Sequence, residues 1–149
     1  MASTNTDVFT GVLELVACLC KLAKEPYDDT RAQNILCLCT AIEVSLKQFQ
    51  PNDVTPLSQP LISALHDIMD LTRRTDRYGG FDCLHGALTI YEAMTRKQPH
   101  LLSRAVLESL GACVTVYMES WPKNMVETQR LQTRITSLHK LLDMDMCVV

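Results

Sequence analysis

Six stretches of helical periodicity run along this chain of 149 residues, and they fall into three pairs of similar layout. In each stretch, apolar residues recur every three or four positions, which is the spacing of an amphipathic α-helix. The pairs span residues 7–49, 58–95 and 99–143, and each contains a helix, a polar turn and a second helix. No segment alternates with a period of two, and no Asn-Gly or Asp-Gly hairpin turn is present. The sequence therefore predicts an all-α fold of six helices.

Proline and glycine clusters mark the ends of these helices. The predicted helices cover residues 7–23, 30–49, 58–74, 81–95, 99–119 and 124–143. We expect residues 52–59 to form a loop, Ser58 to cap the third helix, and residues 144–149 to form a flexible tail. The fifth helix is the most apolar, which predicts a central position for it. Since a single domain commonly has about this length, residues 1–149 are predicted to form one domain.

The three pairs also share their spacing along the chain. A shift of 48 residues superimposes the second predicted helix on the fourth, and with it Gln50-Pro51 on Gln98-Pro99. The other equivalent helices align at shifts of 45–50 residues. Because any two amphipathic helices can be matched along a 3.6-residue grid, the near-constant shift and the repeated Gln-Pro stop carry the argument for repetition. An ordinary six-helix bundle is the alternative.

A period of 45–50 residues with two helices per unit resembles the armadillo and HEAT families of helical repeats. The resemblance covers residues 7–143 and rests on the pattern of helices. It implies a short α-solenoid of three antiparallel helix pairs, whose extended surface binds a partner protein or peptide. Three units are close to the minimum for a stable stack, so the chain is expected to be either a complete small adaptor or a piece of a longer array.

Two other classes of protein are kept as alternatives. A compact bundle would resemble the small Bcl-2-like regulators of some viruses, which bind an amphipathic helix in a groove. The segment Asn-Trp-Gly-Arg, typical of the cellular members, is absent from this sequence. A small α-helical enzyme is the third possibility, and no convergent polar cluster in the sequence supports it.

Charge and hydropathy narrow the classes of partner and the compartment. A net charge of −3 and an isoelectric point near 5.7 disfavour general binding to nucleic acid, which depends on clustered lysine and arginine. No apolar run approaches the length of about 18 residues that a membrane helix needs. The start of the chain lacks the basic region of a secretory signal, and the seven cysteines show no disulfide framework. These features predict a cytoplasmic or nuclear protein.

Two closely spaced cysteine pairs, Cys18-x-Cys20 and Cys37-x-Cys39, suggest metal ligands at first sight. Residues two apart on a helix point about 200° away from one another, so neither pair can hold one ion from an intact helix. We therefore expect buried structural cysteines, free of disulfides, at these four positions.

No motif in the sequence predicts catalysis, and we expect no enzyme activity and no cofactor. Cys83 and His85 could suggest a nucleophile and a base, but the same two-residue spacing points them apart. Asp67 and Asp70 are three residues apart on one predicted helical face, where Arg73 and Arg74 can neutralise them. The glycine pair before the fourth helix lacks the spacing of a phosphate loop.

Two surfaces of a helical-pair stack are candidates for binding a partner. The turns within pairs would share one edge, which gathers aromatic and basic residues of the types that dominate binding hot spots. These residues are Tyr27, Arg73, Arg74, Arg77, Tyr78, Trp121 and Lys123. The alternative there is that each ring only packs on its own turn.

The second candidate is the face made by the second helices of the pairs. On the last of them we expect exposed polar residues, namely Gln129, Arg130, Gln132, Arg134 and Lys140. The resemblance to armadillo and HEAT proteins implies an extended peptide as the occupant of this face, while a solvated charged face is the alternative. A homodimer is left open, because the sequence does not specify the oligomeric state.

Overall fold

The computed structural model describes residues 2–26, 28–74, 80–120 and 125–148, and these contain six α-helices, one 3₁₀ helix and no strand. The helices are α1 Ala2–Lys24, α2 Asp29–Leu46, η1 Pro51–Leu57, α3 Ser58–Arg73, α4 Gly80–Lys97, α5 Arg104–Ser120 and α6 Met125–Val148. The predicted all-α fold of six helices is confirmed.

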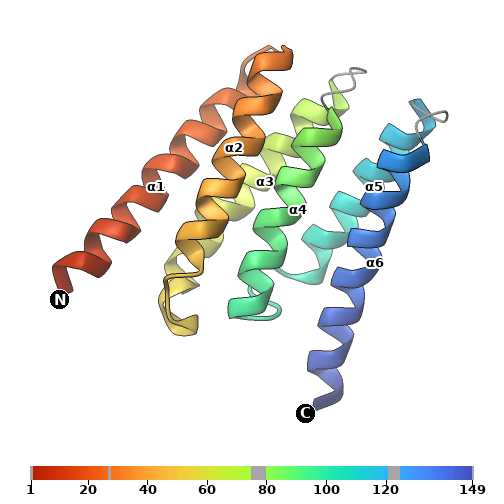
Figure 1. Ribbon diagram of the computed structural model, residues 1–149. Coiled ribbons are helices and arrows are strands. Elements are labelled where there is room, and N and C mark those ends of the chain that lie inside the picture. Colours follow the sequence, from red (N-terminus) through yellow and green to blue (C-terminus); the bar gives the residue numbers. More distant parts are fainter. Residues whose placement is uncertain (1, 27, 75–79, 121–124, 149) are drawn as a thin grey trace.

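The six α-helices form two layers of three (Figure 1). The first helices of the pairs make one layer, in which α3 lies between α1 and α5. The second helices make the other layer, in which α4 lies between α2 and α6. Each pair spans both layers, because α1 packs on α2, α3 on α4 and α5 on α6. This stack of helix pairs is the predicted short α-solenoid.

The central helix of the stack is α4, and the prediction that the fifth helix would be central is wrong. Helix α4 packs against α2, α3, α5 and α6, and most of its residues are buried. Helix α5 belongs to the end pair and leaves Val116 59% exposed. The apolar content of a helix does not specify its neighbours, whereas Gly86 in α4 allows α2 to approach closely. A Cβ atom at that glycine would lie 2.8 Å from the Cys39 sulfur of α2.

The segment predicted as a loop is mostly the 3₁₀ helix η1. Val54 and Leu57 are fully buried, and their spacing of three residues places them on one side of a helix with three residues per turn. Ser58 is the first residue of α3 instead of its cap. The cap position is held by Leu57, which makes no side-chain capping bond. Burial of the two apolar side chains against α3 and α4 therefore orders this connection.

Helix α5 begins at Arg104, later than the predicted start at Pro99. His100 and Ser103 have backbone φ angles of 72° and 66°, in the left-handed region, which interrupts an α-helix. The Tyr91 hydroxyl donates a hydrogen bond of 2.7 Å to the Ser103 carbonyl and fixes the end of this turn. The Ser103 hydroxyl also accepts from the Val106 N–H over 3.4 Å, so a local cap and a contact from α4 both mark the start of α5.

Two other helix ends lie beyond the predicted limits. Helix α1 begins at Ala2, before the predicted start at residue 7, and α6 continues to Val148 through most of the predicted tail 144–149. Neither extension contains proline or glycine, so no residue in them breaks the helix.

The repeated Gln-Pro stops lie side by side on the edge between pairs. The Gln98 side-chain amide donates to the Pro51 carbonyl over 2.6 Å and to the Thr55 hydroxyl over 2.8 Å. The neighbouring Lys97 ammonium donates to the Phe49 carbonyl over 2.8 Å. The sequence period therefore places the end of one pair against the end of the next.

Candidate protein-binding surface

The predicted aromatic and basic edge is described only in part. Tyr27, Arg77, Tyr78, Trp121 and Lys123 lie outside the described residues. The two described members of this set both make contacts within the chain. The guanidinium of Arg73 pairs with Asp70 at 2.9 Å, and that of Arg74 donates to the Ala23 carbonyl of α1 over 3.0 Å. Arg74 therefore helps to join α1 to the end of α3, and the edge as a binding surface stays a prediction.

The polar residues predicted on the last second helix divide into two groups. Those exposed to solvent, as expected, are Gln129, Arg130, Gln132 and Lys140. Arg134 is different, because only 27% of its side chain is exposed and its guanidinium reaches α4. It donates to the His85 carbonyl over 2.9 Å and to the Thr89 hydroxyl over 3.1 Å. Arg134 is therefore only partly exposed, in contrast to the expected exposed position, and its contact with a partner stays a prediction.

The sequence contains a signal for the inward position of Arg134. It lies three residues after Leu131 and four before Leu138, and both leucines are buried. This spacing places Arg134 beside the apolar stripe of α6. A long side chain at such a border can extend along the stripe and reach the neighbouring helix.

His85 is the centre of a polar contact between α4 and α6. Its Nε2 atom lies 3.4 Å from a carboxylate oxygen of Glu127, and its Nδ1 atom lies 3.3 Å from the Arg134 guanidinium. Because a guanidinium can only donate, Nδ1 accepts, and the proton of the neutral ring is placed on Nε2, facing Glu127. Burial and the charge of Arg134 lower the pKa of His85, against the opposing effect of Glu127. The neutral imidazole is thus the form that suits this contact.

Cavities lie on both sides of α4 on the open side of the layer made by α2, α4 and α6, which we name the second-helix face. A cavity of about 450 Å³ lies between α2 and α4, and one of about 260 Å³ lies between α4 and α6. The first is lined by Glu43, Lys47, Pro51, Glu92, Ala93, Arg96 and Lys97. The second is lined by Glu92, Arg96, Ser137, Leu138, Lys140 and Leu141. Glu92 and Arg96 of α4 border both cavities, so they form the ridge between them.

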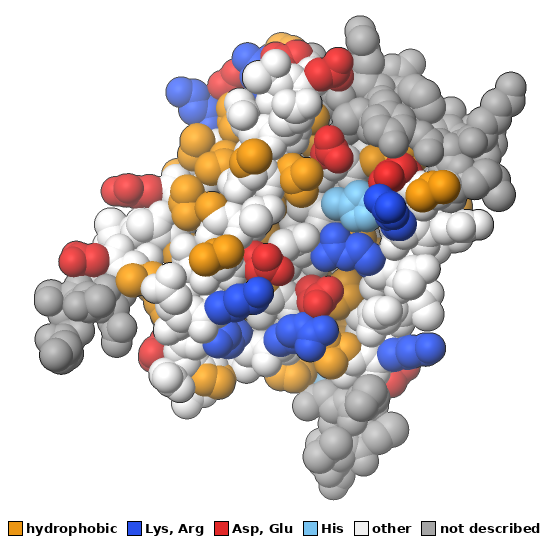
Figure 2. Space-filling view, viewed as in Figure 1, with side chains coloured by type: hydrophobic (Ala, Val, Ile, Leu, Met, Phe, Trp, Pro, Cys, Tyr) orange, Lys and Arg blue, Asp and Glu red, His pale blue; other side chains and the backbone are white. Residues whose placement is uncertain are grey.

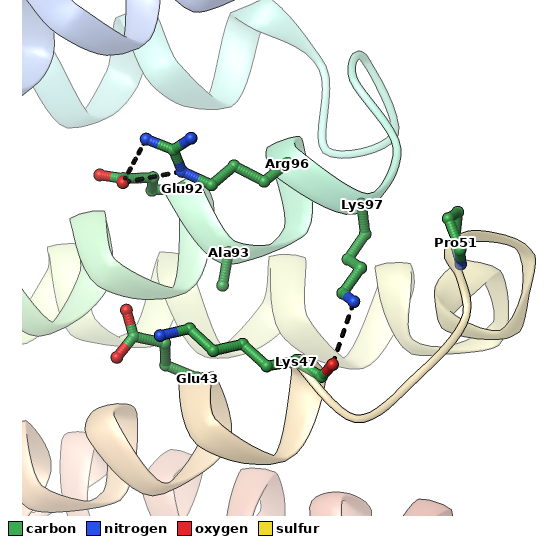
Figure 3. A pocket seen from close by; sticks show the side chains of 7 residues that line it. All are labelled: Glu43, Lys47, Pro51, Glu92, Ala93, Arg96 and Lys97. Carbon is green, nitrogen blue, oxygen red and sulfur yellow. Dashed lines mark hydrogen bonds and ion pairs between the residues drawn. The ribbon is translucent and has the colours of Figure 1, made fainter.

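The cavity between α2 and α4 has a small apolar floor and charged walls (Figure 3). Ala93 of α4 forms the floor, with Glu92 and Arg96 on one side and Glu43 and Lys47 of α2 on the other. The ridge is held in place by the Arg96 guanidinium, whose Nε atom donates to a Glu92 carboxylate oxygen over 3.0 Å. Acidic and basic side chains accordingly gather over the middle of this face (Figure 2).

A further hollow of about 380 Å³ follows the outer side of α6. Its lining includes the predicted residues Gln129, Gln132 and Lys140. Of these three, Lys140 also borders the cavity between α4 and α6. The residues of α2 and α4 were missed, because only the packing of the helices shows which of their polar positions face a groove.

The cysteine pairs have mixed surroundings. Cys39 is buried and Cys20 is half-buried, whereas Cys18 and Cys37 are exposed, so the expectation of burial is wrong for these last two. Each helix buries one stripe, and residues two apart cannot both lie on it. The six cysteines whose side chains are described are free thiols.

The remaining candidate groups from the sequence are Cys83 and the two carboxylates Asp67 and Asp70. Cys83 is buried, and burial raises the pKa of its thiol to about 12, so the reactive thiolate is disfavoured. Among the described side chains, no group of three His, Cys, Asp or Glu residues is arranged to hold a metal ion. Of the two carboxylates, the half-buried Asp67 pairs with Lys24 of α1 at 3.8 Å, and the exposed Asp70 pairs with Arg73 at 2.9 Å.

Within the described parts of the chain, no helix combines the length and apolar character needed to cross a bilayer. Comparisons with known proteins find no matching family model, no matching curated protein and no matching solved structure.

Proposed function

We propose that this protein is a small interaction module of the armadillo or HEAT type, which binds an extended segment of a partner protein across the second-helix face. The observation that carries the proposal is the pair of cavities on either side of α4, on a face that no other element of the described chain covers. The module needs neither cofactor nor catalysis for this role, and it would act in the cytoplasm or nucleus.

The form of the face favours an extended segment over a helix. Its cavities follow one another across three helices, so a strand-like chain can lie across the helix axes and place one side chain in each. The Bcl-2-like alternative requires a long apolar groove for the apolar face of an amphipathic helix. Here the walls of the larger cavity are charged, and its lining is apolar only at Pro51 and Ala93.

A selection from a displayed library of random peptides tests the proposal without knowledge of the natural partner. Selected peptides are resynthesised with a fluorescent label and titrated against the wild type and two tryptophan variants. Ser137→Trp fills the surface where the α4–α6 cavity meets the outer hollow of α6. Ser63→Trp is the matched control, because Ser63 is an exposed residue of α3, which belongs to the other layer.

We expect selected peptides to lose at least about tenfold in affinity with Ser137→Trp, which is about 1.4 kcal/mol, and to bind Ser63→Trp like the wild type. Failure to select any peptide would overturn the proposal. Peptides that bind Ser137→Trp as tightly as the wild type would also overturn it, because they would not use the second-helix face. Circular dichroism on both variants establishes that they are folded.

A further inference from the structure

The cavities of the second-helix face carry an excess of positive charge on a protein whose net charge is −3. Four basic side chains border the two cavities beside α4, namely Lys47, Arg96, Lys97 and Lys140. Only two carboxylates border them, those of Glu43 and Glu92. Lys47 directly follows α2, and the others come from α4 and α6, so together they form a band across the three helices.

One of the two carboxylates is already compensated within the chain. Glu92 accepts from Arg96 at 3.0 Å, and its other oxygen lies 3.9 Å from the Arg134 guanidinium. In contrast, the ammonium groups of Lys47 and Lys140 make no ion pair with any described residue. Both of these lysines are exposed. The two ends of the band therefore hold cations that are available to an incoming anion.

Lys97 adds a third, more rigid donor in the cavity between α2 and α4. Its ammonium donates to the Lys47 carbonyl at the end of α2 over 3.2 Å (Figure 3). It also donates to the Phe49 carbonyl over 2.8 Å. An ammonium has three N–H donors, and these two bonds leave one. The side chain is thus held in place, which lowers the entropy lost when it binds an anion.

We infer that the second-helix face recognises an acidic peptide segment, with one carboxylate between Lys47 and Lys97 and a second between Arg96 and Lys140. This inference rests on the proposed function and names the chemistry of its partner. The α4–α6 cavity also presents Leu138 and Leu141. An aliphatic side chain beside the second carboxylate can therefore bury apolar surface there.

The geometry of the stack sets the spacing of the two carboxylates. Packed helix axes lie about 8–10 Å apart, so the grooves on the two sides of α4 are separated by about that distance. An extended chain advances about 3.3 Å per residue. Acidic residues two or three positions apart in the peptide match the two grooves.

A phosphate backbone fits this band less well than separate carboxylates do. Glu43 and Glu92 lie among the basic groups and would repel a continuous row of phosphates. A peptide can place its carboxylates opposite the cations and a neutral residue opposite each glutamate. The interleaved charges therefore favour a protein partner over a nucleic acid.

Charge-reversal variants titrated with the selected peptides test the inference. Lys47→Glu and Lys140→Glu reverse the charge at the two ends of the band, and Lys21→Glu makes the same change on exposed α1 in the other layer. We expect selected peptides to contain Asp or Glu two or three residues apart. We also expect about a tenfold loss of affinity for each band variant and no more than about twofold for Lys21→Glu. Affinity should fall with added salt, since these charges are exposed.

The possible outcomes separate this inference from the proposed function. Some selected peptides could fail to bind Ser137→Trp, contain no excess of Asp or Glu, and bind Lys47→Glu like the wild type. That result would overturn the inference of an acidic partner and leave the proposed function standing. Peptides that bind Ser137→Trp normally would overturn both proposals. A labelled single-stranded oligonucleotide serves as a competitor, and displacement of the peptides by it at equal concentration would contradict the preference for a protein partner.

Discussion

The two contacts that α4 makes with its neighbours in the second-helix layer are built from different chemistry. Against α2, it presents Gly86, whose missing side chain leaves room for the buried Cys39 sulfur. Against α6, it presents His85, Thr89 and Glu92, which all contact Arg134. The middle of the α2–α4 contact thus depends on shape, and its charged hydrogen bonds lie at the end of α2, where Lys97 donates to the carbonyls of Lys47 and Phe49. The α4–α6 contact instead has directional polar groups along the helices.

The difference indicates how each pair is held in the stack. A shape contact tolerates no added volume but is insensitive to charge and pH. A contact through a guanidinium depends on one side chain and on the protonation of its neighbours. We therefore expect the docking of α6 on α4 to respond to substitution of Arg134. Helix α6 also carries part of the proposed binding face.

Gly86→Ala should have the largest effect on stability, because it prevents the close approach of α2 to α4. The new Cβ would lie 2.8 Å from the Cys39 sulfur, so the two helices must separate or repack. We expect the free energy of unfolding to fall by about 1–3 kcal/mol, although alanine favours a helix by about 1 kcal/mol. Urea denaturation followed by circular dichroism measures the change. In a Cys39→Ala background the same substitution should cost clearly less, and an equal cost would contradict the close contact.

Arg134→Ala should have the next largest effect. It removes the charged hydrogen bonds to His85 and Thr89, and we expect a loss of about 1–2 kcal/mol, reduced by the partial exposure of this side chain. Arg130→Ala is the matched control, since this arginine is 66% exposed and its ion pair among the described residues is with Glu127. Its cost should stay within about 0.5 kcal/mol. Equal losses from the two variants would refute the role given to Arg134.

Gly111→Ala should act in the opposite direction to Gly86→Ala. A Cβ atom at Gly111 in α5 would lie 3.8 Å from Ile135, an ordinary van der Waals contact. Because no clash opposes the higher helix propensity of alanine, we expect the free energy of unfolding to rise by about 0.5–1 kcal/mol in the same urea experiment. A loss of stability here would show that the α5–α6 contact is as tight as the α2–α4 contact.

The smallest expected effect is a dependence on pH through His85. Burial and Arg134 hold its folded pKa below the ordinary value of 6.5, so the unfolded chain binds the proton more readily. The contribution of neutral His85 to the free energy of unfolding is therefore complete at pH values above 6.5. It declines as the pH falls from 6.5 toward the lower pKa of the folded state. Unfolding free energies measured between about pH 7.5 and about pH 5.5 should show this decline.

His85→Gln provides the control for this measurement, because glutamine does not titrate. The decline should be smaller in the variant, and an unchanged decline would assign the pH dependence to other groups. Burial raises the pKa of Asp82 above 3.8, and lower pH then favours the folded state, at more acidic values than for His85. The two effects can therefore be separated by the pH at which they occur.

The helical pattern predicted most of the fold, because burial of an apolar stripe repeats along each helix. The end of α5 was predicted to within one residue, at 119 against Ser120, but its start was placed too early. Ser103, whose hydroxyl accepts from the Val106 N–H, is a local signal for that start, and the hydrogen bond from Tyr91 to the Ser103 carbonyl adds a tertiary one. The segment of η1 was predicted as a loop. Its order comes from the burial of Val54 and Leu57 against the stack, which local propensity does not show.

The candidate site was predictable only in outline. Helical spacing placed Gln129, Gln132 and Lys140 on the exposed side of α6, and all three line its outer hollow. It could not show that Lys47 and Arg96, from different pairs, border the same cavity. That relation depends on how far apart and in what register two helices pack, which the period of one helix does not contain.

The amino-acid sequence alone determined six amphipathic helices and a repeated Gln-Pro stop, because both are local patterns of side-chain type and backbone preference. Only the tertiary structure decided that α4 is the central helix and that Arg134 bonds to a neighbouring helix. It also decided which basic side chains of different helices border the same cavity. Those outcomes depend on contacts between residues about 45–50 positions apart, such as Gly86 with Cys39 and Arg134 with His85, which the local pattern of one helix does not contain.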